Sequence, residues 1–462
     1  MNVQIEEVKR TGMDYGMFER IKEAWTWWQE WVPAPARIRI VGDDDSDGIT
    51  STYQVGNALR RAGYDVDLKI MPIHSPADVD IAFKEPRDGY VVLDSGSSMI
   101  DYIDSFRVPT LILDHHRVQD VKVLNTFEVN PRRLGGDKVE HVSTSILAAM
   151  FAVEVGEHWD VSFAGVAGAI SDRQHLGGFN GLVGYVVAGA LKKGVLSSSP
   201  GFALVGDTVE QAITDSLDPY FEEYTGRPDA VRGLLAKLGI KPDLPTIQLT
   251  GASAAKLAAA LTEPLQKRGV VIERMPILVG ERYALHHTSG VPTIFGLAQL
   301  MEAATAAKAH DVALRTLHGD VNAAREAKSV YRKRLTNILH EVDRMRLRVQ
   351  EAKHMRWAET KDGSNTGVYA HTLLTYVHGD DKPFIVLCRI GDIAKFSSRG
   401  SPRLYHAGID LSIGLGQAAQ KVGGHGGGHP GASGATVPIT KVDEFLAHLD
   451  KILGELGAKG AT

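Results

Sequence analysis

The chain has 462 residues and a formal net charge of −5 at pH 7, with 44% hydrophobic and 23% charged residues. This composition is ordinary for a globular protein of two or three domains with a sizeable core. The charge excludes a globally basic nucleic-acid binder, so any contact with nucleic acid has to come from local patches.

The single cysteine, Cys388, excludes an intramolecular disulfide framework and favours a reducing compartment. It lies in an apolar run, so we expect a buried structural thiol there. The sequence shows no hydrophobic leader and no apolar stretch long enough to span a bilayer. We therefore expect a cytoplasmic protein with no membrane partner.

Residues 16–32 predict a helix within an N-terminal helical arm of residues 1–35. The helix carries four of the six tryptophans: Trp25, Trp27, Trp28 and Trp31. Three of them could share one helical face, which favours packing onto the main domain. A surface for a partner is the alternative, because tryptophan is enriched at interfaces.

An acidic loop follows a short β-branched run at residues 38–41, which predicts a buried strand. The loop carries Asp43, Asp45 and Asp47 and closes at Gly48. Divalent cations such as Mn²⁺ and Mg²⁺ prefer oxygen ligands, and α/β sheets bind ligands at the carboxyl ends of their strands. An acidic turn in solvent explains the loop alone equally well.

Strand and helix signals then alternate, with helices at 49–62 and 77–83 and strands at 65–70, 89–93 and 110–113. This alternation predicts βαβ units and a mainly parallel sheet. Asp94 follows one strand, and His115 and His116 follow another. Because parallel strands end along one edge, these groups can converge with the acidic loop.

A fourth group comes after a predicted helix at 143–155 and an apolar run of small residues at 161–170. Asp172 at that position could complete a metal cluster, although a helix cap or a surface acid is the simpler interpretation of this residue alone.

Residues 216–320 are the least informative, apart from a helical segment at 291–307. From residue 321 to about 359 there is neither glycine nor proline, which predicts a long helix. Residues 321–356 contain ten Lys or Arg residues and four acids. A solvated helical face is the simple interpretation, and contact with a phosphate backbone is the alternative.

The C-terminal region predicts a second sheet, with strands at 368–377 and 384–390, and a final amphipathic helix at 442–456. Ser397, Ser398 and Arg399 can bind phosphate, since guanidinium pairs with phosphate in a bidentate manner and the serines can donate hydrogen bonds. Gly426, Gly427 and Gly428 let backbone amides approach an anion, and His429 can donate to it. A flexible linker is the alternative for these glycines.

Taken together, the motifs resemble the DHH phosphoesterase superfamily, and most of all the archaeal RecJ-like nucleases that associate with GINS. The motifs are the DDDSDG loop, LDSGS with Asp94, Asp114-His115-His116, AGAISDRQ with Asp172, and the glycine-histidine run that ends at residue 434. The resemblance implies an α/β fold in which a parallel-sheet DHH domain is joined by a long helix to a smaller α/β DHHA1 domain. The implied domains are the DHH domain at 36–215, a helical middle region at 216–320, a connecting helix at 321–360 and a substrate-binding DHHA1 domain at 361–462.

The resemblance also implies a site for two Mn²⁺ ions, with Mg²⁺ as the alternative. Asp43, Asp45 and Asp94 would serve one ion. Asp47, Asp94, His115 and Asp172 would serve the other, and His116 would contact or protonate phosphate. At the position of Asp43, many members of the family carry histidine.

The implied activity is hydrolysis of single-stranded DNA or RNA from an end, in replication or repair, with GINS as an implied partner. One alternative is a phosphoesterase for small substrates such as cyclic dinucleotides or short oligonucleotides. The other is a GINS-binding replisome scaffold with little activity.

Overall fold

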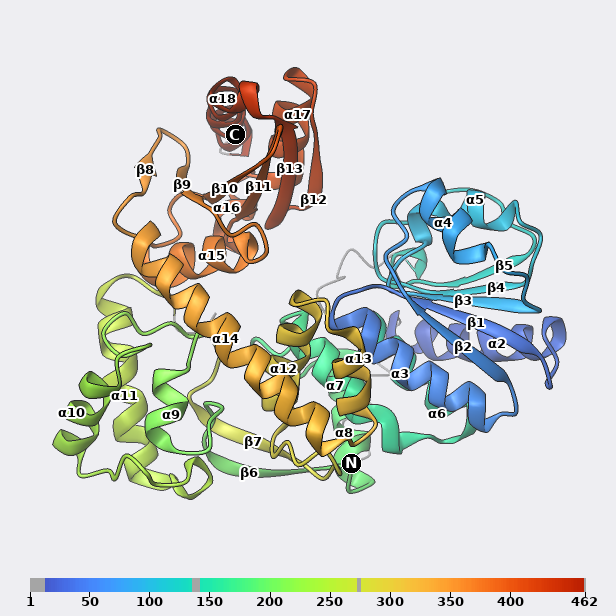
Figure 1. Cartoon of the computed structure of the whole chain (residues 1–462), viewed down its shortest axis with the longest axis horizontal. Helices are drawn as coiled ribbons and strands as arrows, with labels where there is room; N and C mark the ends of the chain where they lie inside the picture. Colours follow the sequence, from blue (N-terminus) through green and yellow to red (C-terminus); the bar gives the residue numbers. More distant parts are fainter. Residues whose placement is uncertain (1–12, 135–141, 272–275, 461–462) are drawn as a thin grey trace. The chain divides into compact units, whose positions relative to one another are not determined.

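The structure is a computed structural model that describes residues 13–134, 142–271 and 276–460 (Figure 1). The chain divides into two compact units. The first comprises Met1–Pro200 and Gly280–Tyr331, and the second comprises Gly201–Val279 and Arg332–Thr462. The segment between the two predicted domains therefore contributes to both units.

A five-stranded parallel sheet forms the centre of the first unit, in the order β2-β1-β3-β4-β5. Its strands are β1 (Arg37–Gly42), β2 (Asp65–Ile70), β3 (Gly89–Leu93), β4 (Thr110–Leu113) and β5 (Thr126–Val129). The predicted parallel sheet is thus confirmed, and β5 is a strand that the sequence did not predict. Gly42, Leu93 and Leu113 lie in one row across the sheet, so β1, β3 and β4 end together.

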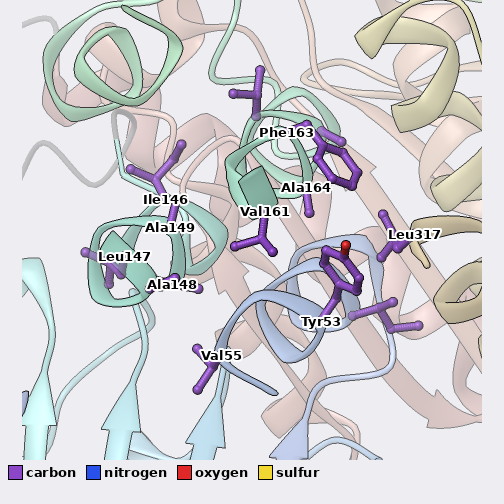
Figure 2. Packing of buried hydrophobic residues seen from close by; sticks show 14 of the residues in the cluster. Tyr53, Val55, Ile146, Leu147, Ala148, Ala149, Val161, Phe163, Ala164 and Leu317 are labelled. Atoms are coloured by element: carbon purple, nitrogen blue, oxygen red, sulfur yellow. The ribbon is translucent and has the colours of Figure 1, made fainter. Parts of the chain in front are cut away.

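Helices cover both faces of this sheet. α2 (Met13–Trp31), α3 (Ser46–Arg61), α6 (Thr144–Gly156) and α7 (Ser162–Ser171) pack on the larger core. Figure 2 shows part of it, where Val55 of α3, Leu147 of α6 and Phe163 of α7 are buried. α4 (Pro76–Phe83) and α5 (Ile100–Asp104) cover the other face. Alternate residues of the inner strands β1, β3 and β4 therefore point into different cores, as in a doubly covered sheet.

The rest of the first unit is mainly helical. α8 (Gly181–Lys192), α12 (Ile294–Ala306) and α13 (His310–Leu317) also contribute to the larger core. β6 (Leu196–Phe202) and β7 (Val279–Leu285) form a separate two-stranded sheet. Trp28 of α2 is fully buried in the core, which confirms the packing interpretation for that residue. Trp31 stacks on Trp27 and stays 47% exposed.

The second unit contains a six-stranded sheet in the order β12-β13-β11-β10-β9-β8. Only the pair β9–β10 is parallel. The strands are β8 (Gln350–Glu351), β9 (Arg356–Thr360), β10 (Phe384–Ile390), β11 (Ile393–Arg399), β12 (His425–His429) and β13 (Ala432–Pro438). This is the predicted smaller α/β domain with its own sheet.

One face of that sheet packs on α17 (Leu411–Lys421) and α18 (Val442–Gly460). On the other face, α15 (Thr366–Thr372) and the π-helical segment η7 (Leu373–His378) pack against β10, and α15 also contacts β11. α16 (Pro402–His406) follows β11. The remaining helices, α9 (Val209–Thr214), α10 (Pro228–Leu238) and α11 (Gly251–Lys267), share a core with part of α14 (Val321–Met345).

One predicted element is wrong, and another is too long. The segment at 368–377 is helical, because residues such as Tyr369, Leu373 and Tyr376 face one core, although their β-branched and aromatic neighbours favour a strand. The helix predicted from 321 to about 359 ends at Met345, and the chain then forms β8 and β9, which join the sheet. Tertiary pairing ends the helix where no glycine or proline marks a stop.

Gly426, Gly427 and Gly428 lie in β12, an extended edge strand. Cys388 is buried in β10, as expected. Among the helices that the structure describes, none combines the length and the apolar character needed to cross a bilayer.

Candidate metal centre

The acidic loop connects β1 to α3. Asp45 caps this helix, because its carboxylate accepts a hydrogen bond from the backbone amide of Gly48 at 3.0 Å. A Cβ added at Gly48 would stand 2.5 Å from the carbonyl oxygen of Asp43, so only glycine fits this close turn. Local chain geometry therefore brings three carboxylates into one short loop.

The carboxylate of Asp47 is fixed by the first turn of α6. The amides of Thr144 and Ser145 donate to its two oxygens at 2.8 and 2.9 Å, and the side chain is buried. The amino-terminal turn of a helix has unpaired amides that bind a carboxylate well. Two segments almost a hundred residues apart thus orient one side chain.

Asp94 comes directly after β3 and is also buried. Its φ angle is 63°, in the left-handed region that residues other than glycine seldom adopt. Its Oδ1 atom accepts a hydrogen bond from the hydroxyl of Thr144 at 3.0 Å. Strained backbone of this kind is frequent at active sites, which agrees with the place of Asp94 in the cluster.

His115 joins these carboxylates into one cluster. Its Nε2 atom lies 3.4 Å from Asp94 Oδ1, 3.7 Å from Asp172 Oδ2 and 3.9 Å from Asp47 Oδ2. Asp172 itself follows α7. Ligand atoms of Asp47, His115 and Asp172 all lie within 4.8 Å of one another, and so do those of Asp94, His115 and His116. The structure therefore brings together five of the predicted site residues.

Asp43 and Asp45 belong to neither of these groups, but they are electrostatic neighbours of the cluster. Burial, followed by the charge of Asp45, raises the pKa of Asp43 to about 7. Loss of solvation, followed by the charge of Asp47, raises the pKa of Asp45. The whole loop thus shares the charge crowding at this edge of the sheet.

The crowding is strongest at Asp94 and Asp172. Burial raises the pKa of both carboxyls well above its ordinary value, and the charges of Asp47 and Asp45 raise it further. Buried carboxylates this close to one another are unfavourable unless cations or protons neutralise them. Oxygen atoms and one imidazole nitrogen form a ligand set that suits Mn²⁺ or Mg²⁺. The residues present therefore fit divalent metal ions.

Asp114 has a supporting role that the sequence did not reveal. It is fully buried and accepts hydrogen bonds from the backbone amides of Ser97, His115 and His116 at 3.0, 2.7 and 3.0 Å. The same carboxylate lies 2.8 Å from Nδ1 of His116. Burial alone would raise the pKa of Asp114, but His116 and the amides bring it to about 2.

The pKa of His116, the partner of Asp114, is shifted in the opposite direction. Burial would lower the pKa of His116, but the hydrogen bond to Asp114 outweighs this and raises it. His115, which has no such bond, has a pKa lowered by burial. The two adjacent histidines are therefore electrostatically different, and only His116 is suited to carry a proton. No sequence signal distinguishes them, since the difference depends on folded contacts.

The end of α12 also reaches the acidic loop. Nζ of Lys308 forms an ion pair with Asp44, and the hydroxyls of Thr305 and Ser46 lie 3.4 Å apart. The charge of Glu302 contributes to the raised pKa of Asp172. This segment lies in the part of the sequence that was least informative, and only its packing shows that it borders the site.

The predicted phosphate-binding residues lie on three adjacent strands of the second unit. Strand register aligns them in rows across β11, β13 and β12. These rows are Ser397–Gly434–Gly427, Ser398–Ser433–Gly428 and Arg399–Ala432–His429. Arg399 and His429 thus share one face, whereas Ser398 is buried on the other and its hydroxyl donates to the carbonyl of Ser433 at 2.9 Å.

Both units correspond to known families. The family model "DHH family, N-terminal domain" matches residues 37–166, and the model "DHHA1 domain" matches residues 355–455. The chain therefore contains a DHH domain followed by a DHHA1 domain, and it has the fold of a DHH-family phosphoesterase. The family and fold class predicted from the sequence motifs are confirmed.

Among individual proteins, an uncharacterized protein of Methanocaldococcus jannaschii is 28% identical over 429 residues, which cover 90% of this chain and 93% of that protein. Exonuclease RecJ bound to manganese superposes with a TM-score of 0.59 at 16% identity, covering 95% of this chain and 96% of RecJ. CDC45 from Entamoeba histolytica gives a TM-score of 0.66 at 12% identity, with 95% and 99% covered. At these identities the two solved structures show a shared fold.

Proposed function

We propose that the chain is a metal-dependent phosphodiesterase, a RecJ-like exonuclease that hydrolyses single-stranded DNA or RNA from an end. One observation carries the proposal: buried Asp47, Asp94 and His115 converge with half-buried Asp172 in one cluster at the edge of the parallel sheet. A cluster this crowded destabilises the fold unless it binds cations. Its presence therefore favours a catalytic role over a purely structural one.

The proposed ions are two Mn²⁺, with Mg²⁺ as the alternative. Asp43, Asp45 and Asp94 would hold one ion, and Asp47, Asp94, His115 and Asp172 the other. Two such ions supply an activated water and neutralise charge on the attacking and leaving oxygens of a phosphodiester. The likeness to RecJ bound to manganese supports this choice of metal.

The chain's own residues supply the proton and hold the ligands. In the proposal, Asp114 keeps Nδ1 of His116 in a fixed hydrogen bond, which leaves Nε2 of the same ring to donate to a phosphate oxygen. Thr144 and Ser145 keep Asp47 and Asp94 in orientation before substrate arrives. Preorganised groups of this kind accelerate the reaction because they need no rearrangement in the transition state.

In the second unit, Arg399 and His429 would bind phosphates of the strand, with Ser397 and the glycines of β12 beside them. Gly426, Gly427 and Gly428 are exposed, so backbone and ligand can approach closely. Ser398 would act by tying β11 to β13 through its bond to Ser433. Guanidinium binding to phosphate is independent of base identity, which agrees with a nuclease of low sequence preference.

The test is digestion of 5′- and 3′-labelled single strands of DNA and RNA by the full chain, in Mn²⁺ and in EDTA. We expect progressive shortening from one end, dependent on metal. No shortening of any strand, with rapid hydrolysis of a cyclic dinucleotide instead, would favour the phosphoesterase for small substrates.

A second candidate is a replisome scaffold with little activity, and the likeness to CDC45 favours it. The intact acidic and histidine cluster argues for the enzyme, since a scaffold has no need of crowded buried carboxylates. GINS as a partner, a role in replication or repair and a cytoplasmic location stay predictions. Metal content together with turnover would separate the enzyme from the scaffold.

A further inference from the structure

The face of the second sheet that carries Arg399 and His429 extends beyond that row. Side chains alternate between the two faces of a strand, and directly paired residues share a face. Lys395 pairs with Thr436, which pairs with His425. Lys395, His425, Arg399 and His429 therefore all lie on the same face.

This face differs from the opposite one in composition, although α15 contacts it at β10 and β11. Phe396, Ala435 and Val437 point to the other side and are buried against α17 and α18. On the face of interest, Lys395 and His425 are exposed. In β11, β12 and β13, all within the described residues, no residue on this face is acidic. The face thus presents two basic rows to its surroundings.

Between the two rows, the surface of the sheet carries few side chains, and we call this surface the glycine floor. Ser397, Gly434 and Gly427 form the row halfway between them. The hydroxyl of Ser397 lies 2.8 Å from that of Thr366 in α15, so the part of this row without side chains is confined to β12 and β13. A Cβ added at Gly427 would meet nothing within 4 Å, so a side chain would fit there without disturbing the fold. The missing side chains therefore leave room for a ligand above these two strands. Packing of the sheet does not explain why glycine stands at position 427.

The spacing of the rows matches a nucleic-acid strand. Lys395 and Arg399 are four residues apart on β11, which corresponds to about 13 Å at roughly 3.3 Å per residue. A stacked strand rises about 3.4 Å per nucleotide, so this distance covers up to about four nucleotides, and fewer when the strand is extended.

From these observations we infer that Lys395 and His425 form a second phosphate site, which binds a different phosphate of the same strand from the one held by Arg399 and His429. The glycine floor accommodates the nucleotides between the two phosphates. The inference rests on the proposed function, and it adds a minimum length of strand that the second unit can hold at full affinity.

The experiment measures binding of the full chain, in Ca²⁺, to a hexanucleotide and to a dinucleotide with a single phosphate. Lys395→Ala should weaken hexanucleotide binding about threefold to tenfold and reduce the salt slope by about 0.7. It should leave dinucleotide binding unchanged, because one phosphate can occupy only the first row. Arg399→Ala should weaken the binding of both the hexanucleotide and the dinucleotide.

Two further variants sharpen the test. Gly427→Val should weaken hexanucleotide binding, because the valine side chain would occupy the surface between the two rows. Lys451→Ala removes an exposed lysine from α18, which packs on the opposite face, and should change neither affinity. Circular dichroism of each variant checks that the fold is retained.

If Arg399→Ala weakens the hexanucleotide but Lys395→Ala and Gly427→Val do not, the second phosphate site is wrong while the proposed function stands. If the unaltered chain binds neither ligand, the proposed function fails, and the second site fails with it.

Discussion

The crowding of carboxylates predicts that the metal-free protein is more stable without Asp94 than with it. Asn keeps an oxygen acceptor for the hydroxyl of Thr144 but carries no charge. Unit charges about 4–5 Å apart repel by about 3–4 kcal/mol at an effective dielectric constant near 20. Wild-type Asp94 escapes part of this cost by binding a proton, which its raised pKa favours. We therefore expect Asp94→Asn to stabilise the metal-free fold by about 2 kcal/mol, or about 4–8 °C in Tm.

The gain should depend on pH in one direction. Because the folded pKa of Asp94 is raised, wild-type stability is lost as pH rises above the unfolded value of about 3.9 towards the folded pKa. The Asp94→Asn variant has no carboxyl at this position and does not lose stability in this way. Its free energy of unfolding should therefore exceed that of wild type by an amount that is smallest near pH 4 and grows with pH.

Adding Mn²⁺ should make the wild-type protein more stable than the Asp94→Asn variant. A ligand that binds only the folded state at 100 times its Kd adds about 2.7 kcal/mol, and the variant lacks a proposed bridging ligand. The assay is thermal denaturation of both proteins in EDTA and in Mn²⁺ at several pH values, beside nuclease activity, which should be lost in the variant. Asp120→Asn, on an exposed loop, is the control and should change little. A wild-type protein that is the more stable in EDTA at pH 8 would refute the reasoning.

Three other predictions follow from the same contacts. Asp114→Asn should lower the pKa of His116, so the alkaline fall in the pH–rate profile should begin at lower pH; an unshifted profile would exclude His116 as the proton donor. Arg399→Ala should weaken strand binding about tenfold to a hundredfold, since a charge-assisted hydrogen bond contributes about 1.5–3 kcal/mol; normal binding with lost cleavage would place Arg399 among the catalytic groups instead. Blunt duplex should be cut more slowly than single strand, because unpairing costs a few kcal/mol per base; equal rates would count against a site that admits one strand.

The motifs that follow the strands could be predicted because they depend on local order. Asp43, Asp94 and His115 stand just beyond β1, β3 and β4, and parallel strands place their carboxyl ends along one edge. The approach of Asp94 and His115 to the acidic loop thus follows from alternating strands and helices, whereas the place of Asp172 after α7 depends on how that helix packs.

Other features depended on contacts between distant segments. Thr144 and Ser145 look like ordinary helix-start residues, and Asp114 looks like one more potential ligand, until the fold shows which atoms they face. Lys308 reaches Asp44 across 264 positions of sequence, a distance over which residue patterns carry no signal.

The elements of the second unit show the same limit. Residues at 368–377 have strand propensity, but the helix that they form buries Tyr369, Leu373 and Tyr376 in a single core. The glycines of β12 could be read as linker or loop, whereas pairing with β13 makes them a strand. Local propensity is worth at most about 1 kcal/mol per residue, so burial and pairing with distant partners decide the structure where the two conflict.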